Sequence, residues 1–291
     1  MNRKVTRRRF LGCSVAAGTV ASGLFINPSR AAESSSPNDK LNLAIIGAAN
    51  KGWHNVQQLT SENVVALCDV DAKYLGRASE AYPKARCYRD YRRMFDAEQN
   101  KIDAAVVSTA DHHHAIATSI ALSLRKHAYC EKPLTHTVAE ARHISKMADE
   151  AKVATQMGTQ IHASNNYRRV VEVIQSEAIG RVNEVYTWCN KGWSGGKFQP
   201  WDGPPPEHLD WNLWLGPAQE RPYSPNIHPA NWRRFWEYGS GTFGDMACHV
   251  MDLPFWALGL QYPTSVSCEG PPVDSVGAPA WVKVHFQFPV K

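Results

Sequence analysis

The sequence predicts a chain in two parts, an α/β first half with a parallel sheet and an α+β second half with a mainly antiparallel sheet. Up to about residue 158, short apolar runs alternate with amphipathic helical segments, as in a parallel sheet that helices cover on both faces. Beyond it, stretches rich in Pro, Gly and Trp separate a few helices and strands. With 291 residues, 43% apolar and 10% aromatic, the chain is long enough for two domains with hydrophobic cores.

Each element of the first half follows from its local pattern. Strands are expected where short apolar runs stand between turn residues, at 41–48, 63–70, 104–109, 128–131 and 153–157. Helices are expected where apolar residues recur every three or four positions, at 52–59, 71–82, 111–124 and 137–151. The last of these helices opens with the capping box Thr137-x-x-Glu140, which marks its first turn.

The second half is expected to contain fewer and more widely spaced elements. These are helices at 165–176 and 244–258 and strands at 180–190, 264–269 and 280–288. Three strands make a small open sheet, and such a sheet needs further partners or cover. We therefore expect this part of the fold to be truncated, or to pair its open edge with a second copy of the chain in a homo-oligomer.

Residues 1–31 have the layout of an export signal, with a basic start, an apolar stretch to Ile26 and small residues Ser29 and Ala31 before a cleavage point. The twin arginines before Phe10-Leu11 resemble a signal for the Tat export machinery. We expect this segment to be cleaved, a polar linker at 32–39, and a mature protein in the bacterial periplasm. A membrane anchor that stays attached is the alternative.

The net charge of +5 depends on the signal segment. Removing residues 1–31 takes away six basic residues and no acidic one, so 26 Lys and Arg would face 27 Asp and Glu, a charge of −1. A chain with this balance has no basic surface for nucleic acid or for an anionic membrane, and we expect neither partner.

The cysteines do not form a recognisable framework. Six lie after the signal segment: Cys68, Cys87, Cys130, Cys189, Cys248 and Cys268. None forms a C-x-x-C pair, and Cys68 and Cys130 stand inside apolar runs. We interpret them as small hydrophobic residues, with disulfides or a zinc site as the alternative.

A dinucleotide site is predicted where the first strand turns into the first helix. The turn reads Gly47-Ala48-Ala49-Asn50-Lys51-Gly52, a G-x-A-x-x-G spacing that lets a pyrophosphate approach the backbone at a helix N-terminus. Asp69 ends the second strand, 22 residues after Gly47, where a carboxylate accepts ribose hydroxyls and repels a 2′-phosphate. The pattern favours NAD over NADP. Ala49 in place of the middle glycine weakens it, and an ordinary βα turn is the alternative.

Glu131-Lys132-Pro133 stands at the tip of an apolar strand-like run. The carboxyl ends of parallel strands are where ligands bind, and a lysine there can donate a hydrogen bond to a substrate hydroxyl. On its own the tripeptide is also a common surface turn.

Asp245 and His249, later in the chain, are four residues apart and therefore lie on one face of a helix. A histidine near neutral pKa suits proton removal from an alcohol. A metal site or a surface salt bridge are the alternatives for this pair, and we expect no metal.

Three further groups leave their alternatives open. His112-His113-His114 fits a helix start better than a metal site, because neighbouring helical side chains diverge. The seven tryptophans in 188–236 suit either a carbohydrate lid or loop anchoring and a subunit interface. Arg233 and Arg234 could bind an acidic sugar, although we expect them on the surface.

Four segments, in this order and spacing, resemble the Gfo/Idh/MocA oxidoreductases over about residues 40–260. They are the glycine turn with Asp69, residues 108–115, residues 131–133 and residues 239–252. The aromatic segment 210–217 is similar to the exported branch of that family. The resemblance implies a Rossmann-like dinucleotide-binding domain over 40–158 and an α+β domain for substrate or oligomerisation over 159–291.

The resemblance also implies roles for individual residues. Thr109, His114, Glu131 and Gln160 would lie near the nicotinamide, Lys132 would contact the reacting hydroxyl, and Asp245 and His249 would complete the site. Ala110 stands where the family usually has proline. The expected activity is NAD-dependent hydride transfer between nicotinamide and a ring hydroxyl of a sugar, cyclitol or glycoside. Redox-assisted glycoside cleavage on the same fold is the first alternative, and a non-catalytic nucleotide- or sugar-binding protein is the second.

Overall fold

The first half is a parallel sheet of six strands in the order β3-β2-β1-β4-β5-β6. The structure is a computed structural model that describes residues 40–289, so the expected signal segment and the whole expected linker lie outside the described residues. The strands are β1 (Asn42–Ile46), β2 (Asn63–Cys68), β3 (Arg86–Tyr88), β4 (Ala104–Val107), β5 (His127–Cys130) and β6 (Thr155–Met157). This order reverses direction between β1 and β4, which makes the carboxyl edge there the expected ligand site.

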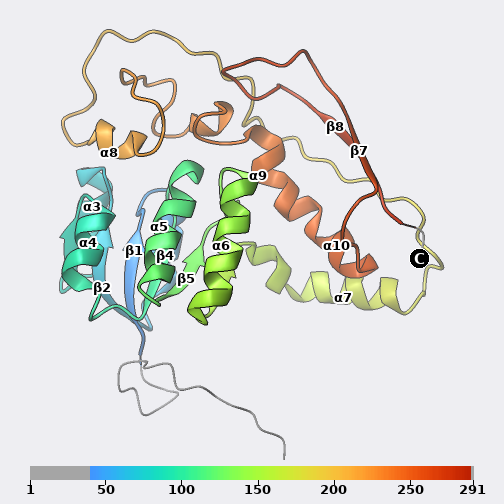
Figure 1. Ribbon diagram of the computed structural model, residues 1–291, viewed down its shortest axis with the longest axis horizontal. Coiled ribbons are helices and arrows are strands. Elements are labelled where there is room, and N and C mark those ends of the chain that lie inside the picture. The colour runs from blue at the N-terminus through green and yellow to red at the C-terminus, as the bar shows by residue number, and fades with distance from the viewer. Residues whose placement is uncertain (1–39, 290–291) are drawn as a thin grey trace, which may run out of the picture. The chain divides into compact units, whose positions relative to one another are not determined.

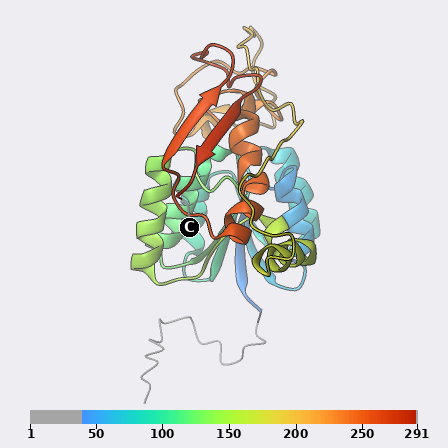
Figure 2. The same ribbon diagram turned by 90° about the vertical axis from the view of Figure 1, so that its right-hand side faces the viewer.

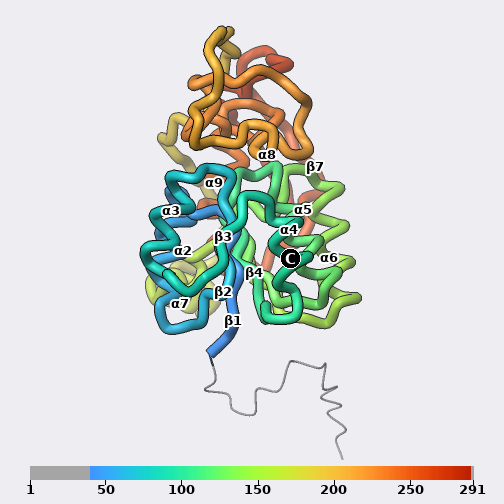
Figure 3. The backbone as a smooth tube through the Cα atoms, turned by 90° about the vertical axis from the view of Figure 1, so that its left-hand side faces the viewer, coloured from blue at the N-terminus to red at the C-terminus, as the bar shows by residue number. Residues whose placement is uncertain are grey.

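Helices cover both faces of this sheet, as the alternating sequence pattern predicts (Figures 1 and 3). They are α2 (Lys51–Gln58), α3 (Ala72–Ala81), α4 (Tyr91–Glu98), α5 (Asp111–Ser123) and α6 (Val138–Ala151). On one face, Val56 of α2 and Leu75 of α3 pack with Ile45 and Leu67. On the other, α4, α5 and α6 pack against Ala44, Ile46 and Val107. The capping box at Thr137 and Glu140 forms as expected.

Two elements of the first half were not predicted. β3 is a three-residue edge strand with Arg86 at its start, too short and too polar to show an alternating pattern. α4 is mainly polar, and of its apolar side chains only Met94 and Phe95 are buried. β3 forms by pairing with the edge of β2, and α4 forms by packing Met94 and Phe95 into the core on that face of the sheet. Both are tertiary reasons that the local pattern does not contain.

The second half combines short helices with a two-stranded antiparallel sheet (Figure 2). Its elements are η1 (Gln160–Ala163), α7 (Asn165–Gln175), α8 (Trp211–Leu215), η2 (Trp232–Arg234), α9 (Gly241–Val250), α10 (Asp252–Leu258), β7 (Ser265–Glu269) and β8 (Lys283–Gln287). The helix expected at 244–258 is divided into α9 and α10 at Met251. Among residues 40–289, no helix is long and apolar enough to cross a membrane.

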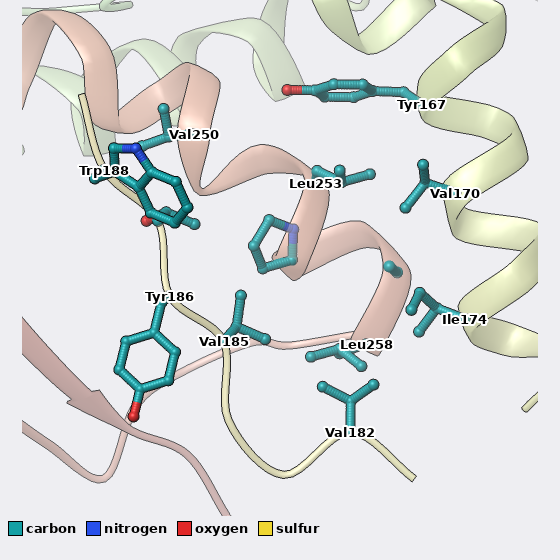
Figure 4. Close-up of a pocket in the computed structure, with 13 residues that line it drawn as sticks. Tyr167, Val170, Ile174, Val182, Val185, Tyr186, Trp188, Val250, Leu253 and Leu258 are labelled. Carbon is teal, nitrogen blue, oxygen red and sulfur yellow. The ribbon is translucent and has the colours of Figure 1, made fainter. Parts of the chain in front are cut away.

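The strand expected at 180–190 is wrong, because this segment has no regular secondary structure. Its alternating apolar side chains find no neighbouring strand, and a single strand without a hydrogen-bonded partner is not stable. Tyr186 and Trp188 are consequently exposed. Between this segment, α7 and α10 lies an apolar pocket of about 390 Å³ (Figure 4). Valine side chains from the segment and from α7 face into it, and none of the predicted site residues lines it.

The middle of the second half is held together by aromatic side chains. Trp211 and Trp214 of α8 stack with ring centroids 4.7 Å apart and planes 7° from parallel. Both are buried with Trp232 and Tyr238 in one hydrophobic cluster. Burial of these three tryptophans supports the loop-anchoring interpretation for them, because rings inside a core are not available to stack on a sugar. Trp188, Trp201 and Trp236 are exposed.

The segment before α8 is tied to the carboxyl edge of the parallel sheet. Ala72 N–H donates to the His208 carbonyl at 2.8 Å, and Asp210 N–H donates to the Val70 carbonyl at 3.0 Å. Asp71 and Leu209 form an isolated antiparallel bridge between these bonds. The second half therefore reaches the loop that follows β2.

Candidate active site

The turn between β1 and α2 requires both of its glycines. Gly47 has φ +88°, and a Cβ there would lie 2.6 Å from the Ser108 carbonyl oxygen. A Cβ on Gly52 would lie 2.2 Å from the Gly47 carbonyl oxygen. Asn50 has φ 46° and gives α2 no side-chain cap. The first N–H groups of α2 have no capping side chain, which leaves them for a ligand such as phosphate.

Asp69 is held at the end of β2 by two backbone donors. Its Oδ2 accepts from Ala48 N–H at 2.7 Å, and its Oδ1 accepts from Asp71 N–H at 2.9 Å. Burial raises the pKa of Asp69 to about 6, against these two hydrogen bonds, so the carboxylate is mainly ionised at neutral pH. The turn and the acid, predicted separately, are therefore joined by a hydrogen bond. Each carboxylate oxygen keeps a lone pair for a ribose hydroxyl.

Glu131 is a buried carboxylate that links β5 to α2. Its Oε1 accepts from Asn55 Nδ2 at 2.9 Å and from the Tyr129 hydroxyl at 3.0 Å, and Lys51 Nζ lies 3.7 Å away. Its Oε2 has no partner among the described residues. A Cβ on Gly158 would lie 2.8 Å from this Oε2, so the turn after β6 also presses against the carboxylate.

Lys132 is held by Asp245. Its Nζ donates to Asp245 Oδ1 at 2.6 Å and to the Asp245 carbonyl at 2.9 Å. The Lys132 side chain is 12% exposed and that of Asp245 is 6% exposed. The surface-turn interpretation of Glu131-Lys132-Pro133 is therefore wrong. Residues 113 positions apart in sequence meet in a nearly buried ion pair.

Arg233 joins the same carboxylate, which the sequence did not indicate. Its Nε lies 2.8 Å from Asp245 Oδ1, close enough for an ion pair, although its N–H does not point along a hydrogen bond. The guanidinium lies over the Trp232 ring, 4.0 Å from the centroid. The expectation that Arg233 is a surface residue is wrong, because Trp232 and Asp245 fix it in the site.

His249 lies one helical turn after Asp245, and its side chain is buried. Its Nδ1 has no partner among residues 40–289. Burial lowers the pKa of His249, and the Lys132 charge lowers it further, so the imidazole is neutral at neutral pH. The alternative of a surface Asp245–His249 salt bridge is not what the structure has, since Asp245 pairs with Lys132 and Arg233. Among the described residues, no three His, Cys, Asp or Glu side chains are arranged so that they could hold a metal ion.

The histidines at the start of α5 join elements together. His114 Nδ1 lies 2.6 Å from the Pro133 carbonyl and its Nε2 lies 3.1 Å from the Thr109 carbonyl. Burial lowers the pKa of His114, so the neutral ring donates to one of these two carbonyl groups while lying between the loop after β4 and the loop after β5. His112 and His113 both place Nε2 near the Trp214 carbonyl, at 3.0 and 2.8 Å. α5 begins at Asp111, so the three histidines lie in its first turn, in agreement with the helix-start interpretation.

Two of the predicted cofactor residues, Thr109 and Gln160, lie in segments that follow strands of the parallel sheet. Thr109 donates its hydroxyl to the Ala110 carbonyl at 3.2 Å, in the loop between β4 and α5. Gln160 is exposed at the start of η1, just after β6. Both stand past the carboxyl ends of strands, and their contact with a nicotinamide stays a prediction.

Asp111 is the clearest site residue that sequence reasoning missed. It begins α5, is 1% exposed, and neither of its carboxylate oxygens has a partner among the described residues. Burial raises its pKa to about 7, while the charges of Arg233 and Lys132 lower the pKa and that of Asp245 raises it. An acid at the first position of a helix is ordinary, so nothing in the local pattern indicates that this one is enclosed.

Comparison with known families agrees with this architecture. The model described as "Oxidoreductase family, NAD-binding Rossmann fold" matches residues 41–159, and "Oxidoreductase family, C-terminal alpha/beta domain" matches residues 147–289. The chain belongs to the Gfo/Idh/MocA oxidoreductase family.

Curated relatives match part of the chain at low identity. Inositol 2-dehydrogenase of Salmonella typhimurium is 27% identical over 155 residues, which is 50% of this chain and 45% of the relative. Levoglucosan dehydrogenase of Pseudarthrobacter phenanthrenivorans is 26% identical over 199 residues, 66% of this chain and 42% of the relative. The chain thus spans about half the length of the curated relatives it matches.

Solved structures share the fold of this Gfo/Idh/MocA chain. GenD2 from gentamicin A biosynthesis, solved with NAD, has a TM-score of 0.62 and 16% identity, over 86% of this chain and 63% of that one. The WlbA dehydrogenase of Bordetella pertussis, solved with NADH and UDP-GlcNAcA, has a TM-score of 0.63 and 18% identity, over 86% and 66%. At such identity the likeness concerns the fold alone.

Proposed function

We propose that this chain is an NAD-dependent oxidoreductase that transfers hydride between nicotinamide and a ring CH–OH group of a sugar or cyclitol. The observation that carries the proposal is the buried Lys132–Asp245 ion pair with a neutral His249 one helical turn away, at the carboxyl edge that also bears the dinucleotide turn. The curated relatives named for inositol and levoglucosan support the substrate class.

The cofactor site fits NAD better than NADP. Gly47 and Gly52 allow the turn to pack closely on itself and on Ser108, and the start of α2 has no capping side chain, so its first N–H groups can donate to a pyrophosphate. Asp69 would accept ribose hydroxyls and would repel a 2′-phosphate by its charge. Glu131, Thr109, His114 and Gln160 would border the nicotinamide end. When bound, the nicotinamide supplies or accepts the hydride.

Lys132 has the geometry to act on the substrate oxygen. Two of its ammonium N–H groups are used by Asp245, so the third is free to donate to a hydroxyl and to stabilise an alkoxide. Asp245 holds this lysine, and Arg233 pairs with the same carboxylate. His249 offers the unpartnered Nδ1 of a neutral imidazole as the first acceptor of the hydroxyl proton.

The test begins with the nucleotide that the purified protein carries or binds, identified by mass spectrometry. A panel of sugars and cyclitols with NAD then follows NADH by absorbance. Net NADH formation with a free sugar or cyclitol supports the proposal. Glycoside cleavage without NADH accumulation would assign redox-assisted cleavage instead. Failure to bind any nicotinamide nucleotide would leave only a binding role.

We further propose that residues 1–31 act as a Tat signal for export to the periplasm, and that 40–158 and 159–291 behave as cofactor and substrate domains. The twin arginines Arg8 and Arg9 support export. Replacing both with lysine should retain a reporter fusion in the cytoplasm. Export of the double-lysine fusion at the normal level would refute Tat dependence.

A further inference from the structure

One segment of the second half is bonded to two loops at the carboxyl edge of the parallel sheet. Residues 208–215, which we call the clamp segment, run from His208 to the end of α8. The start of the segment is bonded to the loop after β2, and its end is bonded to the first turn of α5, which follows β4. In the sheet, β1 lies between β2 and β4. The clamp segment therefore crosses the sheet edge at the end of β1, where the dinucleotide turn begins.

Arg89, just after β3, fastens the start of the clamp segment to the loop after β2. Its Nη2 donates to the Val70 carbonyl at 2.6 Å and to the His208 carbonyl at 3.0 Å. The same two carbonyl groups accept the backbone hydrogen bonds that join the loop to the segment. Hydrogen bonds from a guanidinium are stronger than those between neutral groups, so Arg89 reinforces this junction.

His208 connects the clamp segment to the carboxylate that is proposed to hold the adenosine ribose. Its Nδ1 lies 2.9 Å from Asp71 Oδ1, and the Asp71 N–H donates to Asp69 Oδ1 at 2.9 Å. Asp69 is 9% exposed and Asp71 is 2% exposed. The loop that would receive the ribose is thus enclosed and bonded to the segment, and a nucleotide can reach Asp69 only if this cover moves.

The other end of the clamp segment is anchored at α5. The Trp214 carbonyl lies 3.0 Å from His112 Nε2 and 2.8 Å from His113 Nε2, and all three side chains are buried. A Cβ on Gly216 would overlap the His113 ring, so the chain still lies against α5 just after the segment. Trp214 also packs with Trp211 in the aromatic cluster of the second half.

The two ends of the clamp segment therefore differ in how easily they separate from the sheet. The α8 end is fixed by buried aromatic rings, whereas the His208 side chain is 45% exposed and its end is held by polar bonds alone. Exposed polar bonds exchange with water at a small net cost, while buried rings must lose their packing. Opening of the segment begins at His208, with α8 as the fixed end.

We propose that the clamp segment opens at His208 to admit the nucleotide and closes beside its adenosine half, so that Arg89 and His208 set the rate at which NAD enters and leaves. The inference rests on the proposed NAD site at Gly47 and Asp69. The same bonds must break for entry and for departure. Weakening them should therefore speed both steps and change the affinity little. Residues that only supported Asp69 would instead change the affinity.

The test measures NADH loading and release by stopped-flow fluorescence, with excess NAD to displace bound NADH. Arg89→Met and His208→Leu should each load and release NADH about tenfold faster than the parent, with an affinity within about threefold, because each variant loses hydrogen bonds that hold the segment closed. His208→Asn, whose amide can donate to Asp71 in place of Nδ1, should restore slow exchange. Arg92→Met is the control, because Arg92 is 63% exposed and pairs with Asp90 away from the segment.

The outcomes separate the clamp from the proposed activity. Unchanged loading and release in Arg89→Met and His208→Leu would overturn the clamp and leave the oxidoreductase proposal intact. Weaker binding with unchanged loading would also overturn it, since the two residues would then only support Asp69. Faster exchange in a protein that oxidises no sugar or cyclitol would support the clamp and refute the activity, and a parent that binds no NADH would overturn both. Because His208 is exposed, His208→Leu decides the matter if Arg89→Met does not fold.

Discussion

Asp245 is the residue on which the charges of the site converge. It binds Lys132 through both its side chain and its carbonyl, and Arg233 lies 2.8 Å from the same Oδ1. In a nearly buried setting these interactions are only weakly screened, so removing either partner leaves an uncompensated charge. At the residue scale, removing Lys132 or Asp245 should therefore lower stability as well as activity.

Lys132→Met keeps the aliphatic stem and removes the ammonium group. We expect turnover to fall by about 100-fold or more, because the donor to the alkoxide is lost, while NADH affinity stays within about threefold. NADH absorbance measures the rate and nucleotide fluorescence measures the affinity. Lys146→Met is the control, because Lys146 is 75% exposed on α6 in a weak surface pair. Equal turnover in the parent and Lys132→Met proteins would refute the assigned role.

The Asp111→Asn variant should have a larger free energy of unfolding than the parent protein under mildly alkaline conditions. The pKa of Asp111 is raised from 3.8 to about 7, so the folded state binds this proton more tightly than the unfolded chain. The stabilisation is full below the unfolded pKa and is lost as pH rises through the folded pKa. Asparagine cannot ionise, so the variant avoids a loss on the order of 4 kcal/mol at most.

Urea unfolding at acidic and mildly alkaline pH measures this difference. Asp69, whose pKa is also raised, is present in both proteins, so its effect cancels in the comparison. The two proteins should be about equally stable at acidic pH and should diverge as pH rises. A variant that is less stable by the same amount at both pH values would mean that Asp111 is a structural group with hidden partners.

At the element scale, the dinucleotide turn depends on how closely β1, α2 and β4 approach. Gly47 lies against the Ser108 carbonyl, and Gly52 lies against Gly47 itself. The same packing aligns Ala48 N–H with Asp69. Ala49, in place of the family's middle glycine, is half-exposed and outside this contact.

Gly47→Ala should destabilise the protein by about 1–3 kcal/mol and weaken NAD binding, because a methyl group would enter a positive-φ turn 2.6 Å from a carbonyl oxygen. Gly76→Ala is the matched control. Gly76 lies inside α3 with nothing within 4 Å of its Cβ position, so alanine should stabilise the helix by about 0.5–1 kcal/mol. Calorimetric melting and NADH titration distinguish the two. A Gly47→Ala protein as stable as the parent would show that the turn can relax.

At the scale of the whole molecule, the second half leaves much apolar surface uncovered. Every residue of β7 is exposed, and Val266 is 55% exposed. A two-stranded sheet with such a face gains stability from cover. We proposed association of copies through this sheet from the sequence, and the exposure of its strands supports that proposal.

Val266→Asp should weaken association about tenfold or more if copies pack on the β7–β8 sheet, because the change buries a charge in the interface. Sedimentation equilibrium measures the association constant. Val138→Asp is the control, since Val138 is 68% exposed on α6 in the other half of the chain. A purified protein that is monomeric at all concentrations, or a Val266→Asp variant that associates as the parent does, would refute the proposed interface.

Much of this protein follows from sequence alone. The buried strands of the first half are recognisable as apolar runs, and the capping box at Thr137 marks a helix start, because each depends on residues a few positions apart. The glycine turn and Asp69 mark the cofactor site because they stand at a fixed spacing within one strand–helix–strand unit. The tertiary structure decided the rest. Segment 180–190 does not pair with another strand. Arg233, expected on the surface, forms an ion pair with Asp245, and Asp111 is buried. Those outcomes depend on contacts between segments that are distant in sequence, and a local pattern does not indicate which charged side chains will be buried together.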